Sequence, residues 1–284
     1  MQPSYDVIIA GTGAMGGAAA DCLSARGLRV LALDRFSPPH KLGSSHGETR
    51  VIREAYFEHP SYVPLVQRAY QLWRELENRT GRSLLKTTGG LMIGPPDGMV
   101  FSGAKRSAEE HHLPHEILDH HAVNERFPAF RMPADFLAVH EPRAGMLFVE
   151  SCIEAFIQQA KNQGAETRFY ETVLSWKSDA HGVSVTTNKG SYTAGKLLVT
   201  VGAWLGDLVP DAALTLTIER QVLHWFETEN LSEAHHPDTF PVNAWEFEPG
   251  LFFYTLPDAG SGVKVALHHQ GETTDPETDR KSVV

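Results

Sequence analysis

The chain has 284 residues, a length that fits one large domain or two ordinary ones. Acidic residues outnumber basic residues by 35 to 25, and the formal net charge of −10 argues against binding along a nucleic-acid backbone, which needs a basic surface. The two cysteines, Cys22 and Cys152, are too few for a disulfide framework or a cysteine-rich metal site. The sequence contains neither a secretory signal nor an apolar run of about 18 residues, so it predicts a cytoplasmic protein without a membrane span.

The first forty residues follow the pattern of a dinucleotide-binding βαβ unit. Residues 5–10 (YDVIIA) form a short apolar run that is typical of a buried parallel strand. A glycine-rich turn follows (GTGAMGG, residues 11–17), then apolar residues at helical spacing, and then a second apolar run over residues 28–33 that ends in Asp34. Strand, glycine turn, helix, strand and acid in this order predict a dinucleotide site.

The glycine positions of this turn have separate physical reasons. Gly11 permits the tight turn, Gly13 leaves room for a pyrophosphate, and Gly16 lets the helix pack closely on the strand. Amide groups at a helix start bind phosphate, and a carboxylate at the end of the second strand accepts ribose hydroxyls. We therefore predict these cofactor contacts: Gly11, Gly13, Ala14, Met15, Gly16, Asp34 and Arg35. The fingerprint alone is compatible with FAD or with NAD.

The segment after the second strand contains a loop of Gly, Ser and His residues and then two arginines, Arg50 and Arg53. If this segment is helical, the two arginines share a face. A guanidinium pair beside a cofactor loop is suited to clamping a carboxylate through parallel hydrogen bonds. The alternative is that both arginines lie at the surface and pair with Glu48 and Glu54. From these residues alone both interpretations stay open.

The rest of the chain predicts a mixture of helices and strands. Helices are expected from their apolar stripes over residues 62–79, 101–112, 122–127 and 151–164. Strands are expected over residues 84–93, 113–118, 171–174, 183–187 and 192–201. From residue 215 onward, strand patterns that are typical of an antiparallel sheet occupy residues 216–226, 250–254 and 263–268.

Several segments together resemble the family of monomeric sarcosine oxidases, flavin-dependent amine oxidases that include N-methyltryptophan and pipecolate oxidases. The most specific segment is GSSHGETRVIR, residues 43–53, followed by Tyr56. The likeness continues along the chain through YVPL (62–65), TGGLMIG (88–94), Glu141-Pro142 with Gly145, GKLLVTVGAW (195–204) and GVKVALHH (262–269). The resemblance implies FAD as the cofactor rather than NAD.

The resemblance also implies the fold class. We expect an α/β protein in which an FAD-binding, Rossmann-like domain of the glutathione-reductase type is interleaved with an antiparallel-sheet substrate domain. Residues 1–86 and 142–214 are expected to form the FAD-binding domain, and residues 87–141 and 215–284 the substrate domain. The resembling oxidases continue well past this length and carry a cysteine that links the flavin covalently. We therefore expect this sequence to be about three quarters of a longer chain, without that cysteine.

Roles for individual side chains follow from the family's motifs. By this match, Arg53 binds the substrate carboxylate and Arg50 lies nearer the flavin ring. Lys264 matches the lysine that promotes oxygen reduction, although a lysine on an edge strand can also serve only to prevent aggregation. Tyr254 and His268 match residues that line the substrate site. Further cofactor contacts are implied at Gly43, Ser44, His46, Val173, Gly202 and Trp204.

Two residues depart from the family's pattern. Glu54 stands where the sarcosine and N-methyltryptophan oxidases have histidine beside the arginine, so that a carboxylate either weakens the anchor or points away from it. Trp245 stands where the sarcosine enzyme has a smaller side chain, which predicts a differently shaped pocket. The 15 histidines include adjacent pairs, whose side chains point in different directions, and we expect no metal site.

The sequence thus predicts an FAD-dependent oxidase of N-methyl or other secondary amino acids. Its partners would be a small amino acid substrate and molecular oxygen. Its products would be an imine, which hydrolyses to an aldehyde and an amine, and hydrogen peroxide. We expect a monomer with no nucleic-acid or membrane partner. The alternatives are an FAD-dependent amino acid dehydrogenase that uses another electron acceptor, and a non-catalytic flavin-binding fragment.

Overall fold

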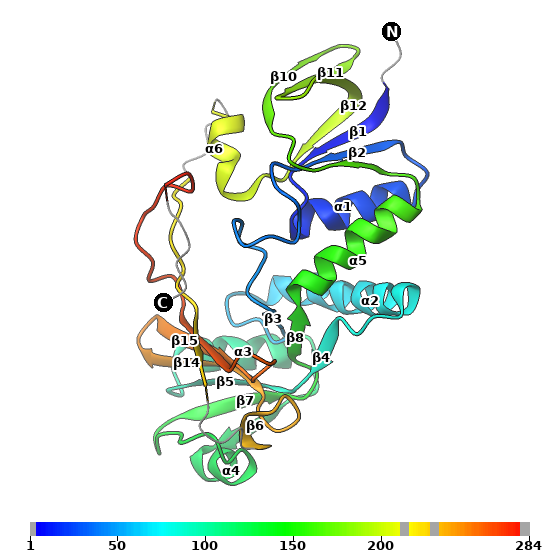
Figure 1. Ribbon diagram of the computed structural model, residues 1–284. Coiled ribbons are helices and arrows are strands. Elements are labelled where there is room, and N and C mark those ends of the chain that lie inside the picture. The colour runs from blue at the N-terminus through cyan, green and yellow to red at the C-terminus, as the bar shows by residue number, and fades with distance from the viewer. Residues whose placement is uncertain (1–3, 211–215, 228–232, 279–284) are drawn as a thin grey trace. The chain divides into compact units, whose positions relative to one another are not determined.

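The computed structural model describes residues 4–210, 216–227 and 233–278. The chain forms two compact units, and Figure 1 labels most of their helices and strands. Unit 1 comprises Met1–Gly47, Val149–Ile218 and Thr273–Val284, and unit 2 comprises Glu48–Phe148 and Glu219–Glu272. The domain bounds expected from the sequence differ from these units in two ways. They assign residues 215–218 and 273–284 to the substrate domain, whereas these residues belong to unit 1. They also assign residues 48–86 and 142–148 to the FAD-binding domain, although strands of these segments pair with each other and belong to unit 2.

Unit 1 is built on a mostly parallel sheet. Within the described residues its strand order is β10-β11-β12-β1-β2-β9. Strands β12, β1, β2 and β9 are parallel, whereas β11 runs antiparallel to both of its neighbours, β10 and β12. The apolar residues of the first strand are buried on both faces, as expected for the interior of a parallel sheet. The strands are β1 (Tyr5–Ala10), β2 (Val30–Leu33), β9 (Glu166–Arg168), β10 (Val173–Asp179), β11 (Gly182–Thr187) and β12 (Ser191–Val199).

Two helices, α1 (Ala14–Ser24) and α5 (Val149–Asn162), lie side by side in unit 1 (Figure 1). Their small residues Ala20 and Ala160 pack with the β-branched side chains of β1 and β2, so the helices approach the sheet closely. The short helices η2 (Gly202–Trp204) and α6 (Leu205–Leu208) follow β12. This arrangement confirms the predicted Rossmann-like α/β class.

Unit 2 contains two sheets. In its described residues the larger sheet has the strand order β13-β16-β15-β14-β5-β7-β6, in which only the β14–β5 pair is parallel. The smaller sheet has the order β3-β8-β4 and is antiparallel. The strands are β3 (Thr49–Ile52), β4 (Leu85–Thr87), β5 (Gly90–Gly94), β6 (Glu116–Asp119), β7 (Leu137–Glu141), β8 (Gly145–Phe148), β13 (His224–Phe226), β14 (Val242–Glu248), β15 (Leu251–Leu256) and β16 (Val263–Leu267).

The predicted strands of unit 2 need several corrections. Strands β3, β7 and β8 were not predicted as strands, and the strand expected over residues 216–226 is formed only as β13, from His224. The single strand expected over residues 84–93 is divided into β4 and β5, because Gly89 between them has a left-handed backbone with φ of 74°. Strand β14 was not predicted at all. Its sequence VNAWEFE has polar residues that the structure buries, Asn243 and Glu246, and these interrupt the apolar pattern.

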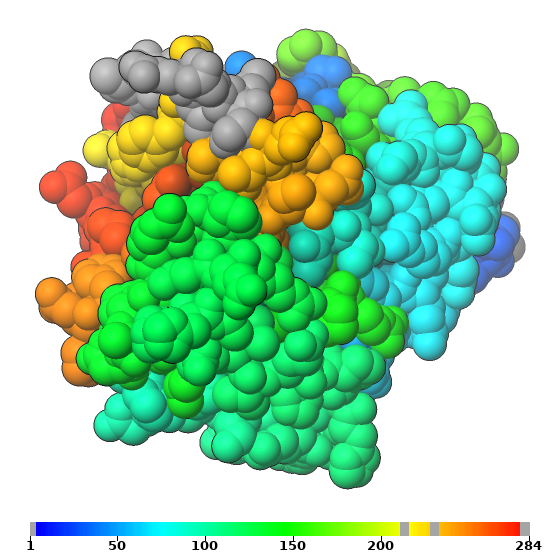
Figure 2. All heavy atoms as spheres, turned by 90° about the horizontal axis from the view of Figure 1, so that it is seen from below, coloured from blue at the N-terminus to red at the C-terminus, as the bar shows by residue number. Residues whose placement is uncertain are grey.

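The helices of unit 2 are η1 (Pro60–Tyr62), α2 (Val63–Thr80), α3 (Met99–Glu110), α4 (His120–Arg126) and η3 (Glu233–His235). Helix α2 ends at Gly81, which has a left-handed backbone. Half of its residues are exposed, and its cyan atoms form part of the face seen in Figure 2. Helix α3 buries Val100, Phe101 and Ala104 against the large sheet. Among the described residues, no helix combines the length and the apolarity that a bilayer span requires.

Candidate functional site

A cavity of about 580 Å³ lies within unit 1, at the carboxyl ends of its parallel strands. This is the edge at which open α/β sheets bind ligands. The cavity is lined by these predicted cofactor residues: Gly11, Gly13, Ala14, Met15, Asp34, Arg35, Gly43, Ser44, Val173, Gly202 and Trp204. Of the other predicted contacts, Gly16 and His46 belong to unit 1 without lining the cavity, and Arg50 lies on β3 of unit 2.

The glycine turn has no space for side chains at two of its positions. Gly11 has a φ of 89°, and a Cβ there would lie 2.5 Å from the Thr200 carbonyl oxygen. A Cβ on Gly16 would lie 1.8 Å from the Gly11 carbonyl oxygen, so only glycine allows α1 to start this close to the strand. At Gly13 the nearest atom to a Cβ would be the Ser45 hydroxyl at 3.5 Å, an ordinary contact. The turn therefore keeps an open surface at Gly13, where a pyrophosphate would approach.

The N-terminus of α1 supplies hydrogen-bond donors to this cavity. Gly13 is its N-cap and provides no side chain, and the Ala14 N–H lies 3.3 Å from the Ser45 hydroxyl. Ala14 and Met15 both line the cavity, so the first turn of the helix presents its amides there. Amides at a helix start favour a phosphate group.

Asp34 is buried at the end of β2, and its carboxylate accepts hydrogen bonds from the chain itself. One oxygen, Oδ2, accepts from the Thr12 N–H at 2.7 Å and the Thr12 hydroxyl at 3.0 Å, and Oδ1 accepts from the Phe36 N–H at 2.8 Å. Burial acts to raise the pKa of Asp34, but His40 and the Phe36 and Thr12 donors outweigh it and hold this pKa below its ordinary value. Oδ1 accepts only the Phe36 N–H at hydrogen-bond distance among the contacts described, with His40 3.8 Å away, so a charged Asp34 can still accept a ribose hydroxyl there.

These features fit the adenosine diphosphate part of FAD. The turn leaves room at Gly13, the start of α1 offers amides, and Asp34 is a charged acceptor on the cavity wall. Val173 and Trp204, expected at the adenine side and at the turn after β12, line the same cavity. FAD would therefore be held mainly by backbone groups of unit 1 together with one carboxylate.

Two acidic residues near the cavity were missed in the sequence. Glu171 precedes β10, is almost fully buried on the cavity wall, and accepts hydrogen bonds from the Thr187 and Tyr192 hydroxyls, each at 2.7 Å. Glu277 binds Arg35 through two hydrogen bonds and accepts a third from the Trp204 indole at 2.7 Å. Their partners are distant in sequence, so no local signal could have indicated these contacts.

Three of the four predicted catalytic residues, Tyr254, Lys264 and His268, lie on one face of the large sheet of unit 2. Tyr254 pairs with Ala266 across β15 and β16, and Lys264 pairs with Leu256, so Tyr254 and Lys264 are diagonal neighbours on the same face. His268 follows β16, and its ring stacks on Phe252 with a centroid distance of 4.3 Å and lies 6.4 Å from the Tyr254 ring. The sheet register, which the sequence does not specify, brings these residues together.

Arg53 follows β3 and is held by aromatic rings and by one carboxylate. Its guanidinium lies 4.2 Å from the Tyr56 ring centre and 4.3 Å from that of Phe57, and Nη2 donates to both carboxylate oxygens of Glu58 at 2.9 Å. Phe57 packs edge-on against Phe252, which also contacts His268. The helical geometry considered for Arg50 and Arg53 does not occur, because β3 is a strand paired with β8.

Lys264 is only 2% exposed. Its ammonium group donates to the hydroxyl of Thr49 at 2.7 Å and to the carbonyl of the same residue. Trp225 pairs with Lys264 across β13 and β16, and its indole donates to Glu48 at 3.3 Å. A buried ammonium group held by oxygen atoms of β3 is part of the unit 2 interior and not an edge lysine exposed to water.

The structure corrects the interpretation of Trp245. This residue pairs with Phe253, and the two rings stack at 6.0 Å with an interplanar angle of 6°. Neighbours along a strand point to opposite faces, so Trp245 and Tyr254, whose partner is Ala244, lie on opposite faces of the sheet. Trp245 therefore does not shape the face that carries Tyr254 and Lys264. Among the described residues, no group of three or more His, Cys, Asp or Glu side chains is arranged to hold a metal ion.

Comparisons with known proteins give related enzymes along the whole chain. Residues 6–283 match the family described as FAD dependent oxidoreductase. The chain is 42% identical over 286 residues to monomeric sarcosine oxidase of Streptomyces avermitilis, covering 100% of this chain and 74% of that protein. It is 36% identical over 278 residues to N-methyl-L-tryptophan oxidase of Yersinia pestis, covering 98% and 74% respectively.

A solved structure is also similar to this chain. The open form of NikD, described as an unusual amino acid oxidase essential for nikkomycin biosynthesis, superposes with a TM-score of 0.83 at 27% identity, covering 99% of this chain and 74% of that one. These matches confirm the predicted resemblance and FAD as the cofactor, and the unit 1 cavity provides the groups that FAD requires. Taken with the geometry, they establish that the chain belongs to the family of FAD dependent oxidoreductases.

Proposed function

We propose that this flavin-dependent oxidoreductase oxidises N-methyl or other secondary amino acids, with molecular oxygen as the electron acceptor. The observation that carries the proposal is Arg53, a largely buried arginine that already holds a carboxylate, that of Glu58. FAD, when bound, would take up a hydride from the carbon beside the amine nitrogen and pass its electrons to oxygen. The products would be an imine, hydrolysed to an aldehyde and an amine, and hydrogen peroxide.

The surroundings of Arg53 suit an amino acid substrate. The guanidinium is oriented by Tyr56 and Phe57, so its donors are fixed in direction before a ligand arrives. A substrate carboxylate would take the place of Glu58 and form charge-assisted hydrogen bonds of the same kind. The names of the relatives support this class of substrate, since they include a sarcosine oxidase and an N-methyltryptophan oxidase.

Tyr254 and His268 would keep the substrate amine in an uncharged environment. Burial raises the pKa of Tyr254, and the charge of Arg50 opposes this only in part. Burial and the neighbouring His269 lower the pKa of His268 below its ordinary value of 6.5. Both side chains are therefore neutral near pH 7, and His268 can accept a proton from an ammonium substrate.

Lys264 would assist the reaction with oxygen. Its ammonium group is buried and oriented by Thr49, so its charge acts in a medium that screens it weakly. Such a fixed cation favours the negative charge that develops as oxygen is reduced.

The names of two relatives, monomeric sarcosine oxidases, support a monomeric state for this protein.

The test is peroxide release by purified protein with its bound flavin. N-methylglycine, N-methyl-L-tryptophan and L-pipecolate are supplied in air, with glycine and L-tryptophan as matched compounds without the N-methyl group. We expect peroxide from at least one secondary amino acid, with equimolar formaldehyde where an N-methyl group is lost. Rapid anaerobic flavin bleaching with slow reoxidation in air would instead indicate a dehydrogenase. Reduction of the flavin by NAD(P)H alone would refute the proposal.

A further inference from the structure

Glu141, the last residue of β7, holds the backbone immediately after Arg53. Its side chain is 1% exposed. One carboxylate oxygen accepts the Glu54 N–H at 2.7 Å, and the other accepts the Ala55 N–H at 2.8 Å. Because each oxygen takes one of two successive amides, the carboxylate fixes both the position and the direction of this segment.

The segment bound by Glu141 is packed rigidly around the guanidinium. Ala55 and Phe57 are buried in the core cluster that includes α3, and the Glu54 carbonyl accepts the Tyr56 N–H at 2.8 Å. Tyr56 and Phe57 provide the two rings beside the Arg53 guanidinium. A shift of the backbone at residues 54 and 55 would therefore move these rings and the guanidinium with them.

Glu141 is also coupled electrostatically to Arg53. Burial, together with the charge of Glu54, raises the pKa of the Glu141 carboxyl group above its ordinary value, while the Glu54 and Ala55 amides and, least of all, the positive charge of Arg53 act in the opposite direction. The carboxylate thus interacts with the Arg53 segment through both hydrogen bonds and charge. Glu141 is the last residue of β7, and the end of a strand requires neither these two hydrogen bonds nor the charge interaction with Arg53.

We propose that Glu141 is a positioning residue for substrate binding: its two hydrogen bonds to the Glu54 and Ala55 amides set the position in which Arg53 receives a substrate carboxylate. This inference rests on the function proposed above, in which Arg53 is the anchor. Glu141 itself would not touch the substrate.

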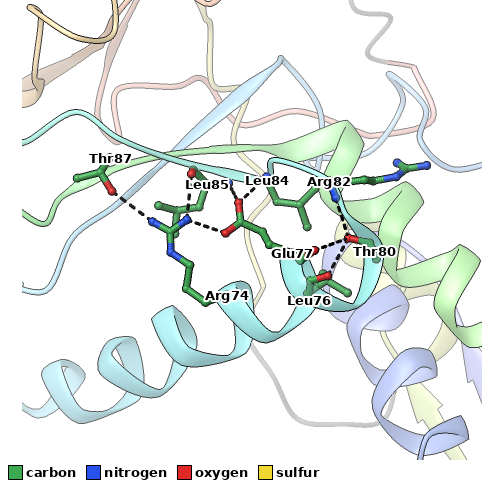
Figure 3. Close-up of polar contacts among 8 residues, drawn as sticks. All are labelled: Arg74, Leu76, Glu77, Thr80, Arg82, Leu84, Leu85 and Thr87. Atoms are coloured by element: carbon green, nitrogen blue, oxygen red, sulfur yellow. Dashed lines mark hydrogen bonds and ion pairs between the residues drawn. The ribbon is translucent and has the colours of Figure 1, made fainter.

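The chain offers a matched control in Glu77 of α2. Its carboxylate oxygen Oε1 accepts the backbone amides of Leu84 and Leu85 at 2.8 and 3.0 Å, and Figure 3 shows this arrangement together with the pairing to Arg74. Glu77 therefore performs the same structural task for the connection between α2 and β4. Glu77→Gln removes the same charge as Glu141→Gln from a carboxylate that binds two successive amides, without contact to the segment after Arg53. Because one Glu77 oxygen accepts both amides, this control reports the loss of charge, and Glu141→Gln adds the loss of an acceptor.

The experiment measures ligand binding to the flavin-loaded protein without turnover. The probe is butyrate, the carbon isostere of N-methylglycine, with its neutral amide, butyramide, for comparison. Binding is followed by the change in flavin absorbance in the wild type, Glu141→Gln, Glu141→Asp, Glu77→Gln and Arg53→Met. We expect Glu141→Gln to weaken butyrate binding about tenfold or more, because it replaces one acceptor by an amide donor facing an N–H. Glu141→Asp should weaken it less, and butyramide binding should not change.

The outcomes separate this inference from the proposed function. Loss of butyrate affinity in Glu141→Gln but not in Glu77→Gln supports the inference, even if no amino acid is oxidised. Equal butyrate affinity in Glu141→Gln and the wild type, with loss in Arg53→Met, overturns the inference and leaves the proposed function standing. Butyrate binding that does not depend on Arg53 overturns both. If neither Glu141 variant folds, hydrogen exchange in the wild type decides: slow exchange of the Glu54 and Ala55 amides supports the inference, and rapid exchange overturns it.

Discussion

The cavity of unit 1 and the sheet face of unit 2 are built from different parts of the chain. In unit 1 the essential groups are backbone amides, glycines and one carboxylate, and most come from a single stretch of about thirty residues. In unit 2 the essential groups are side chains carried by β15, β16 and the segment after β3, which are far apart in sequence. The comparison shows that a backbone site can be identified from local sequence, whereas a side-chain site depends on strand register.

The two regions also treat charge differently. In unit 1, donors around Asp34 overcome the effect of burial and lower its pKa, so the carboxylate stays charged. In unit 2, burial dominates, so that the pKa values of Glu54 and Tyr254 are raised and that of His268 is lowered. Each of these shifts favours the neutral form. The cofactor region keeps its charge, and the region proposed for the substrate suppresses charge except at its arginines and lysine.

The largest expected effect tests whether FAD binding by unit 1 requires the absence of a side chain at Gly16. Gly16→Val should abolish FAD binding and unfold the apoprotein at a much lower temperature, because its Cβ would overlap the Gly11 carbonyl. Gly13→Ala meets only ordinary contacts, so it should leave apoprotein stability unchanged while weakening FAD binding. Thermal unfolding and flavin fluorescence titration measure both quantities. A stable, FAD-binding Gly16→Val protein would contradict the backbone account of this site.

The next largest effect concerns the side-chain site of unit 2. Arg53→Met should reduce kcat/KM for an N-methyl amino acid by about 10³-fold, the loss of two charge-assisted hydrogen bonds. FAD content should not change. Arg68→Met, on the exposed surface of α2, is the control, since Arg68 pairs with Gln71 and Glu75 of its own helix. Steady-state kinetics on both variants provides the measurement, and equal kcat/KM values for the two would remove Arg53 from the site.

Lys264→Met should separate the two halves of the proposed reaction. Oxygen consumption is expected to fall by about 10²-fold, the scale of losing one preorganised electrostatic group. Anaerobic bleaching of the flavin by the amino acid should be much less affected, because Lys264 is held by Thr49 and has no assigned role in binding the carboxylate. Stopped-flow absorbance measures both half-reactions. Equal slowing of the two would indicate that Lys264 serves the fold of unit 2 instead of the reaction with oxygen.

The smallest expected effect tests the suppression of charge in unit 2. Burial raises the pKa of Glu54 above its ordinary value of 4.5, with Arg143, 3.4 Å away, acting in the opposite direction. When the pKa of a carboxyl group is higher in the folded state than in the unfolded state, the folded protein loses stability as the pH rises above the unfolded-state pKa. The reason is that ionising the group costs more free energy in the fold. Glu54→Gln should therefore unfold a few degrees higher than the wild type at pH 8.

The pH dependence is the decisive part of this prediction. The stabilisation by Glu54→Gln should shrink toward pH 4, where Glu54 is protonated in the wild type as well. Thermal unfolding measured between pH 4 and pH 8 gives the difference directly. Glu110→Gln, an exposed carboxylate at the end of α3, is the control and should show no such trend. A stabilisation that grows as the pH falls would contradict the buried-charge explanation.

Much of unit 1 could be predicted because its signals are local. The glycine turn and Asp34 lie within one βαβ unit, and that order of elements admits few alternative folds. Unit 2 was predicted less well. Its strand β14 was missed because Asn243 and Glu246 are polar yet buried. Trp245 was expected to change the pocket, but its pairing with Phe253 places it on the sheet face opposite Tyr254.

By itself the sequence determined the FAD-binding turn, the family and the identity of the charged residues Arg53 and Lys264. The turn follows from residue types at fixed spacing, whereas the family and the candidate roles of Arg53 and Lys264 follow from the resemblance to the sarcosine oxidases. Only the tertiary structure decided that Glu141 holds the backbone after Arg53, that Thr49 holds Lys264, and that Glu277 reaches Arg35. The physical reason is that a hydrogen bond between distant segments depends on strand register and chain packing, and neither is recorded in the spacing of residues along the chain.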